Sequence, residues 1–277
     1  MKFLFTFGIS LSAFLSGLSQ AEGYLHAWHS RHADASRVFI GARDPDGRSS
    51  YERLATLASP GACVLDVACG TGALLARVGA TVPSTQLVGV DFCQSELRLA
   101  RGRLPGVALY AARAQALPLT DAAFDLVVCH MALMLMDNPE RALAESRRVL
   151  RRGGTFSAIT NLPAAPDEIA KTILGALRSR WKAASPSLLP APALGDPRTH
   201  DTTTLRPLVS AYFQRVVVEP FAVTQRVSRA ELWPYLVNSI YGLDAIPAHE
   251  GEDALADLSL PDPIPWTVAM LQVQGRA

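Results

Sequence analysis

The sequence predicts a doubly wound α/β fold whose seven-stranded sheet is mostly parallel. An apolar run at residues 63–67 breaks into a turn that contains Gly70 and Gly72, and a helical pattern follows directly. A second apolar run, residues 87–90, ends at the acid Asp91. Apolar runs and helical patterns then alternate along the chain, as they do where helices connect parallel strands.

Strands are expected where a short apolar run is bounded by turn residues or alternates with polar residues. Helical patterns separate the first three of these runs and also the fourth from the fifth, a loop at residues 112–119 joins the third to the fourth, and the last two follow a proline-rich stretch. The predicted strands are residues 63–67, 87–90, 107–110, 121–128, 156–160, 213–223 and 266–273.

Capping residues set the predicted helix boundaries. Ser49 or Ser50 is a suitable N-cap. Pro139 begins a later helix, and Gly153 and Gly154 end it. The predicted helices are residues 51–58, 73–78, 94–103, 139–152, 202–212 and 229–240.

The N-terminal segment, residues 1–21, stands outside this pattern. It has an early cation, an apolar run and the small-x-small sequence Ser19-Gln20-Ala21, which is the outline of a signal peptide cleaved before Glu22. Its apolar residues also recur at three- and four-residue steps, so an uncleaved helix is an alternative, as is an overextended gene start. Such a helix would cover a site or pair with a second subunit, so a homodimer is possible. Residues 22–39 follow as a broken helical segment ahead of the sheet.

Composition points to a small-molecule partner. The 277 residues carry a net charge of +1, 18% of them are charged, and no run of five or six like charges appears, so no nucleic-acid partner is expected. The apolar start is too short and too serine-rich for stable membrane insertion. The four cysteines lack C-x-x-C spacing, which favours buried free thiols and no metal site. We expect residues 22–277 to form one domain.

The turn after the first strand narrows the choice of ligand. A dinucleotide fingerprint requires a third glycine where Leu75 stands, and no G-K-[ST] follows, which excludes a P-loop. Asp66 at the strand end suits a cationic ligand and would repel a pyrophosphate. Asp91 can accept hydrogen bonds from both ribose hydroxyls. A cationic nucleoside is therefore favoured, and a nucleotide-linked oxidoreductase is the weaker alternative.

Three segments resemble motifs of class I S-adenosylmethionine-dependent methyltransferases of the small-molecule group (type 11, ubiquinone-biosynthesis-like). Residues 66–72 match (D/E)-x-(G/A)-x-G-x-G, residues 112–119 are similar to G-D-A-E-x-L-P-F, and residues 145–154 to E-x-x-R-V-L-x-P-G-G. The resemblance spans about residues 50–160. It implies the Rossmann-like methyltransferase fold, S-adenosylmethionine as cofactor, and methyl transfer to an oxygen, nitrogen or carbon of a small molecule. A non-methylating member that keeps this fold as a cofactor-binding scaffold is the alternative.

The resemblance also implies a set of cofactor contacts. Arg113 departs from it, because the family has an aspartate there that accepts from the adenine amino group, whereas arginine only donates. We expect Arg113 to be solvated and the backbone amide of Ala114 to contact the ring. The implied cofactor-binding residues are Asp66, Ala68, Gly70, Gly72, Asp91, Phe92, Ala114, Gln115 and His130.

His130 has two possible roles. It ends the fourth predicted strand, where the family contacts the cofactor largely through backbone, and this is the favoured role for a lone histidine. Its imidazole could also act as a catalytic general base, since its ordinary pKa is near neutral. His29 and then His26 are the further candidates for a base.

Substrate contacts are expected from the segment ahead of the sheet and from a later insertion. By resemblance, Tyr24, Trp28 and Arg31 are candidates, although each could equally cap the core. Met134 offers an apolar wall. Residues 162–199, rich in proline, are expected to form a lid over the substrate.

Two arguments about localisation oppose each other. The signal-like segment favours export. S-adenosylmethionine is a cytoplasmic metabolite, however, so an exported enzyme would lack it. We expect a cytoplasmic protein, with export as the alternative.

Overall fold

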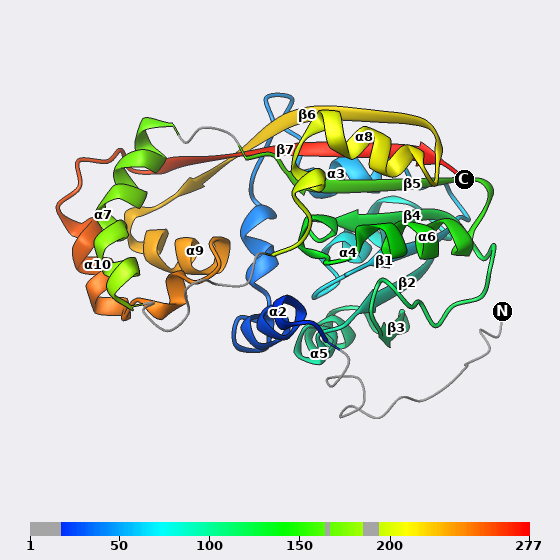
Figure 1. Ribbon diagram of the computed structural model, residues 1–277, viewed down its shortest axis with the longest axis horizontal. Helices are drawn as coiled ribbons and strands as arrows, with labels where there is room; N and C mark the ends of the chain where they lie inside the picture. Colours follow the sequence, from blue (N-terminus) through cyan, green and yellow to red (C-terminus); the bar gives the residue numbers. More distant parts are fainter. Residues whose placement is uncertain (1–17, 164–166, 185–193) are drawn as a thin grey trace.

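The predicted fold class is confirmed by the computed structural model, which describes residues 18–163, 167–184 and 194–277. Seven strands form one sheet in the order β3-β2-β1-β4-β5-β7-β6 (Figure 1). The first five strands run parallel, and β7 runs antiparallel between β5 and β6. The strands are β1 (Cys63–Val67), β2 (Gln86–Asp91), β3 (Ala108–Ala111), β4 (Phe124–His130), β5 (Leu150–Asn161), β6 (Gln214–Val227) and β7 (Ile264–Arg276).

Helices cover both faces of this sheet. Along β1 and β4, alternate residues point to opposite faces, and both sets are apolar: Leu65 and Val127 lie in one core, and Val64 and Leu126 in another. Helices α6 and α8 complete the first core, and α3 and α4 the second (Figure 1). The helices are α2 (Gln20–Arg31), α3 (Ser50–Ala55), α4 (Ala73–Thr81), α5 (Gln94–Arg103), α6 (Pro139–Val149), α7 (Glu168–Ala184), α8 (Thr202–Ser210), α9 (Leu232–Ser239) and α10 (Ala248–Ala256).

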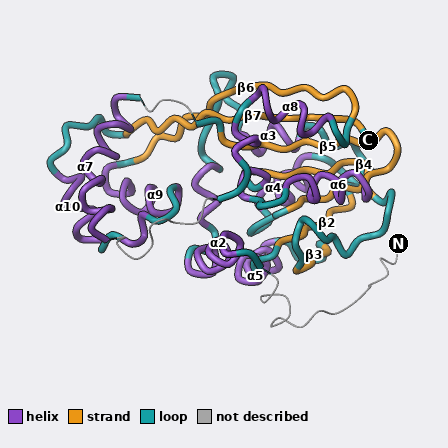
Figure 2. Tube along the Cα trace, viewed as in Figure 1, coloured by secondary structure: helices purple, strands orange, loops and turns teal. Residues whose placement is uncertain are grey.

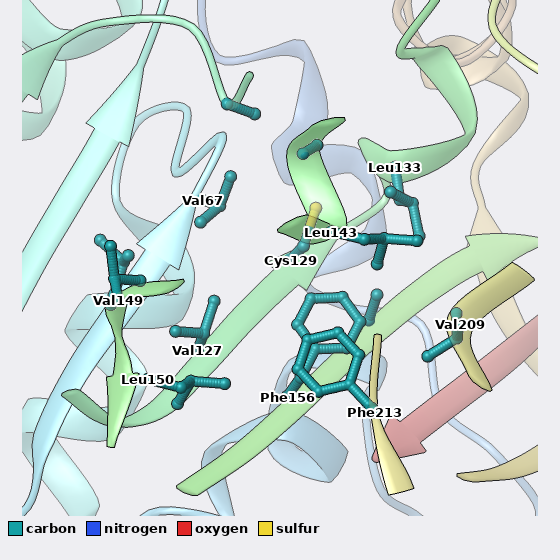
Figure 3. Close-up of a cluster of buried hydrophobic side chains, with 14 of the residues drawn as sticks. Val67, Val127, Cys129, Leu133, Leu143, Val149, Leu150, Phe156, Val209 and Phe213 are labelled. Carbon is teal, nitrogen blue, oxygen red and sulfur yellow. The ribbon is translucent and has the colours of Figure 1, made fainter. Parts of the chain in front are cut away.

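The core under α6 and α8 is closed by two aromatic rings. Phe156 on β5 and Phe213, just before β6, stack with ring centroids 4.8 Å apart and an interplanar angle of 13°. Figure 3 shows both rings beside Leu143 of α6 and Val209 of α8. This packing fixes α6 and α8 on one face, and it leaves the carboxyl ends of β1, β2 and β4 free to build a site.

Several helix boundaries differ from the prediction, and those of α3 and α6 have a clear cause. Ser49 is the N-cap of α3 and forms a reciprocal capping box with Glu52, but the helix ends at Ala55 and not at residue 58. Helix α6 begins at Pro139 as predicted, yet it ends at Val149, and Leu150 already pairs with Phe124 of β4. Strand pairing therefore overrides the helical pattern at residues 150–152, and β5 begins six residues earlier than predicted.

A second, smaller lobe lies beyond the sheet. Strands β6 and β7 extend beyond the other strands of the sheet as a paired ribbon, and α7, α9 and α10 pack around the far end of that ribbon (Figures 1 and 2). This lobe has its own core, which includes Leu177 of α7, Leu236 of α9 and Leu255 of α10. Helix α10 was not predicted, and both strands are longer than predicted. Among the described residues, the insertion after β5 thus contributes α7 to this lobe, and residues between β6 and β7 contribute α9 and α10.

Part of the predicted N-terminal segment falls outside the described residues. Within residues 18–21, Ser19 caps α2 through a capping box with Glu22, and Gln20 and Ala21 belong to the same helix as residues 22–31. After α2 the chain continues into a 3₁₀ helix, Ala35–Phe39. Residues 1–17 of the signal-like segment, and residues 164–166 and 185–193 of the expected lid, are not described. No described helix has the length and apolarity needed to cross a membrane.

Candidate functional site

The turn after β1 presents backbone, not side chains, to the space above it. Ala68 and Gly70 have positive φ angles of 58° and 51° and line a cavity at the carboxyl edge of the sheet. Gly72 has a φ of 78° and begins α4, but it faces away from the cavity: a Cβ there would lie 2.4 Å from Leu104 Cδ1. Gly70 therefore opens the site, whereas Gly72 packs the turn against the end of α5.

Asp66 lies at the end of β1, and one of its carboxylate oxygens is available to bind a ligand. The residue is buried, and its Oδ1 has no hydrogen-bond partner within the described part of the chain. Burial, and then the neighbouring Asp91, raise the pKa of this carboxyl well above its usual range. A cationic group on a ligand would satisfy the free oxygen and stabilise its charge. The site is therefore suited to an ammonium group beside the turn.

Asp91, at the end of β2, is held rigidly by two backbone donors. The Gly70 N–H donates to Oδ2 at 2.8 Å, and the Cys93 N–H donates to Oδ1 at 2.7 Å. Burial raises the pKa of Asp91 to about 6, and these two backbone hydrogen bonds oppose the rise. Each oxygen keeps lone-pair capacity for one further donor. This arrangement suits a pair of neighbouring hydroxyls, such as those of a ribose.

Beyond Asp91, a charged pair closes one end of the cavity. Arg113 is not solvated as expected: its Nη2 donates to Glu22 Oε1 at 2.6 Å and to Oε2 at 2.7 Å. Glu22 comes from α2 and is buried. Phe92 and the segment Ala114–Gln115 line the cavity beside this pair, with room for a flat ring against Phe92. Because Glu22 lies 91 residues before Arg113, local sequence offered no signal of their pairing.

His130 is enclosed by neighbouring side chains. Its Nε2 lies 2.8 Å from Ser50 Oγ, and its ring stacks on Tyr51 with centroids 4.0 Å apart. Burial lowers its pKa to about 3, so the ring is neutral near pH 7 and a weak base. These surroundings favour the backbone role for His130 over the role of general base.

His29 is placed differently, between two polar partners in the cavity wall. Its Nδ1 lies 3.0 Å from Glu96 Oε1 on α5, and its Nε2 lies 3.1 Å from Tyr241 Oη, just after α9. Sequence reasoning missed both partners. Glu96 reads as a solvated helix residue and Tyr241 as part of a loop, and only the fold brings them to His29.

The cavity has a volume of about 400 Å³ and collects most of the predicted site residues. Residues from the lobe also line it, among them Asn238, Tyr241 and Trp266. Sequence reasoning had no means to assign these to the site. The predicted residues that line the cavity are Trp28, His29, Asp66, Ala68, Gly70, Asp91, Phe92, Ala114, Gln115, His130 and Met134.

Gly72, Tyr24, Arg31 and His26 are not among the described residues of the lining. Arg31 has an exposed side chain that pairs with Asp244 at 3.2 Å. Tyr24 faces the lobe near Gly242, and His26 lies edge-on to Phe92. The positions of Tyr24 and Arg31 therefore do not support the predicted substrate contacts.

Comparison with known proteins finds matches to the central part of the chain. Residues 65–158 match the family described as "Methyltransferase domain". A malonyl-[acyl-carrier protein] O-methyltransferase of Methylococcus capsulatus is 31% identical over 140 residues, which cover 50% of this chain and 48% of that protein. The chain thus spans about half the length of this curated relative.

Solved structures extend the likeness to the fold. Phosphoethanolamine N-methyltransferase 2 of Haemonchus contortus, solved with S-adenosylhomocysteine, superposes with a TM-score of 0.56 at 13% identity, covering 94% of this chain and 60% of that chain. The [4+2]-cyclase SpnF superposes with a TM-score of 0.55 at 18% identity, covering 93% of this chain and 97% of that chain. At these identities the structures show a shared fold.

Proposed function

Because residues 65–158 of this chain match the family described as "Methyltransferase domain", we propose that the protein transfers a methyl group from S-adenosylmethionine to a small molecule. The observation that carries the proposal is the pair of acids at the carboxyl ends of β1 and β2. Asp66 has a buried oxygen without a described partner, and Asp91 has both oxygens fixed by backbone N–H groups. A ligand with an ammonium group next to a ribose satisfies both.

Each part of the cavity then has a task in holding the cofactor. Asp66 and the backbone at Ala68 and Gly70 take the amino-acid end, and Asp91 takes the ribose hydroxyls. Phe92 lies against the adenine, whose edge meets Ala114 and Gln115. The cofactor, when bound, supplies an electrophilic methyl group on a positively charged sulfur. The residues of this chain orient it and exclude water, so proximity supplies much of the rate enhancement.

We assign binding of the methyl acceptor to the part of the cavity that the lobe lines. We propose that Trp28 and Met134, with lobe residues such as Trp266, contact the acceptor, and that the insertion within residues 162–199 acts as part of a lid. Support comes from the cavity lining, which joins residues of the sheet and of the lobe around one volume. The free thiols of the four cysteines are buried and take no part in this assignment.

Calorimetry tests this proposal directly. S-adenosylmethionine and S-adenosylhomocysteine are each expected to bind at one site, and NAD is expected not to bind. Asp91→Asn removes the negative charge that the ribose hydroxyls require, so it should weaken binding by about 10–100-fold, the range for a charge-assisted hydrogen bond. Binding of NAD alone would favour the oxidoreductase alternative. Failure of both sulfur nucleosides to bind would refute the proposal.

We also propose a cytoplasmic location, where the cofactor is made. The described part of α2 supports this indirectly, since Ser19 caps, and Ala21 belongs to, the helix that carries Glu22 into the site. Cell fractionation followed by N-terminal sequencing tests it. A mature chain that begins at Glu22 in an extracytoplasmic fraction would overturn the cytoplasmic assignment.

A further inference from the structure

Glu96, His29 and Tyr241 form one hydrogen-bonded row in the wall of the cavity. His29 Nδ1 lies 3.0 Å from Glu96 Oε1, and His29 Nε2 lies 3.1 Å from Tyr241 Oη. The three residues come from α5, α2 and the segment after α9. The row therefore forms where α2, α5 and the lobe come together, and all three residues line the cavity.

The chemistry of the row fixes the direction of its hydrogen bonds. An ionised Glu96 carboxylate can only accept, so His29 Nδ1 carries the hydrogen and Nε2 is left as an acceptor. Tyr241 must then donate its hydroxyl hydrogen to Nε2. The Tyr241 oxygen keeps lone pairs, and Tyr241 lines the cavity. The Tyr241 oxygen is thus available to accept a hydrogen bond from a ligand O–H.

The burial of Glu96 indicates that the row can stabilise a positive charge on His29. Its side chain is 2% exposed, and its described hydrogen bonds are to His29 and, at 3.4 Å, to the Asp34 backbone N–H. Placing a carboxylate there is costly unless a cation or a strong donor accompanies it. An imidazolium at His29 would supply that cation. The row is therefore suited to receive a proton from the cavity and keep it.

Trp28 adds a second polar contact beside Tyr241. The two rings lie edge to face with centroids 4.6 Å apart. Trp28 is 2% exposed and lines the cavity, yet its indole N–H has no partner in the part of the chain that the structure describes. A ligand oxygen next to the hydroxyl would satisfy this donor.

We propose that Glu96, His29 and Tyr241 deprotonate a hydroxyl of the methyl acceptor, so that the acceptor atom is oxygen, in a molecule that carries a second oxygen for the Trp28 N–H. The inference rests on the proposed function. The acceptor O–H proton passes to Tyr241 Oη as the Tyr241 proton passes to His29 Nε2. The freed electron pair on oxygen forms the bond to the methyl carbon, while the carbon–sulfur bond breaks and its electrons stay on sulfur. The imidazolium at His29 remains paired with Glu96.

The experiment uses the full chain saturated with S-adenosylhomocysteine, and 4-nitrophenol as the probe. Phenol and phenolate forms of this probe differ in visible absorbance, so the ionised fraction of bound probe is measured directly. At a pH one unit below the probe's own pKa, about a tenth of it is ionised in free solution. Asp91 and His26 also interact electrostatically with His29, so the pH is held constant across all variants.

In the unaltered protein most of the bound probe is expected to be ionised, an increase of at least about 10-fold in its ionisation equilibrium. His29→Gln keeps a donor for Glu96 and an acceptor for Tyr241 but cannot take up a proton, so bound probe should return to the ionised fraction of free probe. Tyr241→Phe and Glu96→Gln should do the same. The matched control is Asp244→Asn, which removes the negative charge that pairs with Arg31 and His32 between α2 and the lobe and leaves the row intact. It should behave as the unaltered protein.

Several results would overturn the inference: no binding of 4-nitrophenol, bound probe with the ionised fraction of free probe, or an increase that survives His29→Gln. With S-adenosylmethionine, transfer to phenol should exceed transfer to aniline and fall at least about 100-fold in His29→Gln. Preferred transfer to aniline would also overturn it. Each of these results leaves the proposed function standing, because cofactor binding is measured first; absence of that binding refutes the proposed function instead.

Discussion

At the Asp91 carboxylate, protonation and ligand binding compete. Its pKa is raised to about 6, chiefly by burial, so the folded protein binds this proton more tightly than the unfolded chain does. The raised pKa therefore makes a stabilising contribution at low pH that is lost as the pH rises through about 6. The ribose hydroxyls need the ionised form. Low pH thus favours the folded protein at this residue and disfavours the bound ligand.

Affinity for S-adenosylhomocysteine is accordingly expected to depend on pH. It should be constant above about pH 7 and weaken by up to about 10-fold for each pH unit below 6, as protonation of Asp91 competes with the ligand. Calorimetry at several pH values between about 5 and about 8 measures this. In Asp91→Asn the affinity should be lower and its dependence near pH 6 lost. An unaltered protein with equal affinity at both ends of the range would contradict the assignment.

Gly72 allows a second prediction, because the structure contains a matched glycine. Gly47 and Gly72 both have positive φ, 80° and 78°, but a Cβ on Gly47 would meet nothing within 4 Å. Gly47→Ala should lower the free energy of unfolding by about 1–2 kcal/mol through backbone strain alone. Gly72→Ala should cost a further ~1–3 kcal/mol, since its Cβ would overlap Leu104.

Thermal or denaturant unfolding of the two variants gives the comparison. Equal losses for Gly47→Ala and Gly72→Ala would show that Leu104 yields without cost. A larger loss for Gly72→Ala would support the packing role.

The local sequence was sufficient to predict residues whose role depends only on their position at the end of a strand. Asp66, Gly70 and Asp91 follow directly from apolar runs, and parallel strands bring such ends to one edge. Glu96 and Tyr241 could not be predicted in this way. Their contacts with His29 span 67 and 212 residues, and neither residue type marks a site by itself.

At the level of single elements, α2 is the helix on which the cavity depends most. It supplies Glu22, Trp28 and His29 to the lining, and its start is fixed by the Ser19 capping box. The Glu22–Arg113 pair ties it to the segment after β3, with side chains 7% and 32% exposed. Sequence reasoning identified a broken helix here, but it could not find a partner for Arg113 that lies on another element.

A double-mutant cycle on this pair tests how strongly α2 is held. Glu22→Gln, Arg113→Gln and the double variant should give a coupling energy of about 0.5–3 kcal/mol in unfolding experiments, since Glu22 is buried. The single Glu22→Gln variant should also weaken S-adenosylhomocysteine binding, because α2 covers the cavity. Additive losses, with no coupling, would mean that the pair does not hold the helix.

For the whole molecule, the main feature is that the sheet and the lobe have separate apolar cores. The sheet has apolar clusters on both faces, and the lobe has a separate cluster around Leu177, Leu236 and Leu255. Sequence reasoning predicted the sheet well, because its strands are short apolar runs in regular alternation with helices. It did not foresee the lobe, whose parts come from two insertions that flank β6 and whose helix α10 has few apolar residues.

Leu177→Ala tests the lobe core separately from the cores of the sheet. Leu177 is fully buried in the lobe and is not among the described residues of the cavity lining, so the change should lower the free energy of unfolding by about 2–5 kcal/mol. Binding of S-adenosylhomocysteine, measured by calorimetry on the folded variant, should be unchanged. A large loss of cofactor affinity would show that the lobe core also supports the cofactor end of the site.

The long β6–β7 ribbon has a mechanical consequence. Its pairing continues from Val217 opposite Gln274, inside the sheet, to Val227 opposite Ile264, inside the lobe. Along these two strands the lobe is therefore joined to the sheet by a hydrogen-bonded beam, not by a slack tether. Motion of the lobe relative to the sheet must bend or twist this pair of strands, so their right-handed coiling sets the resting position of the lobe.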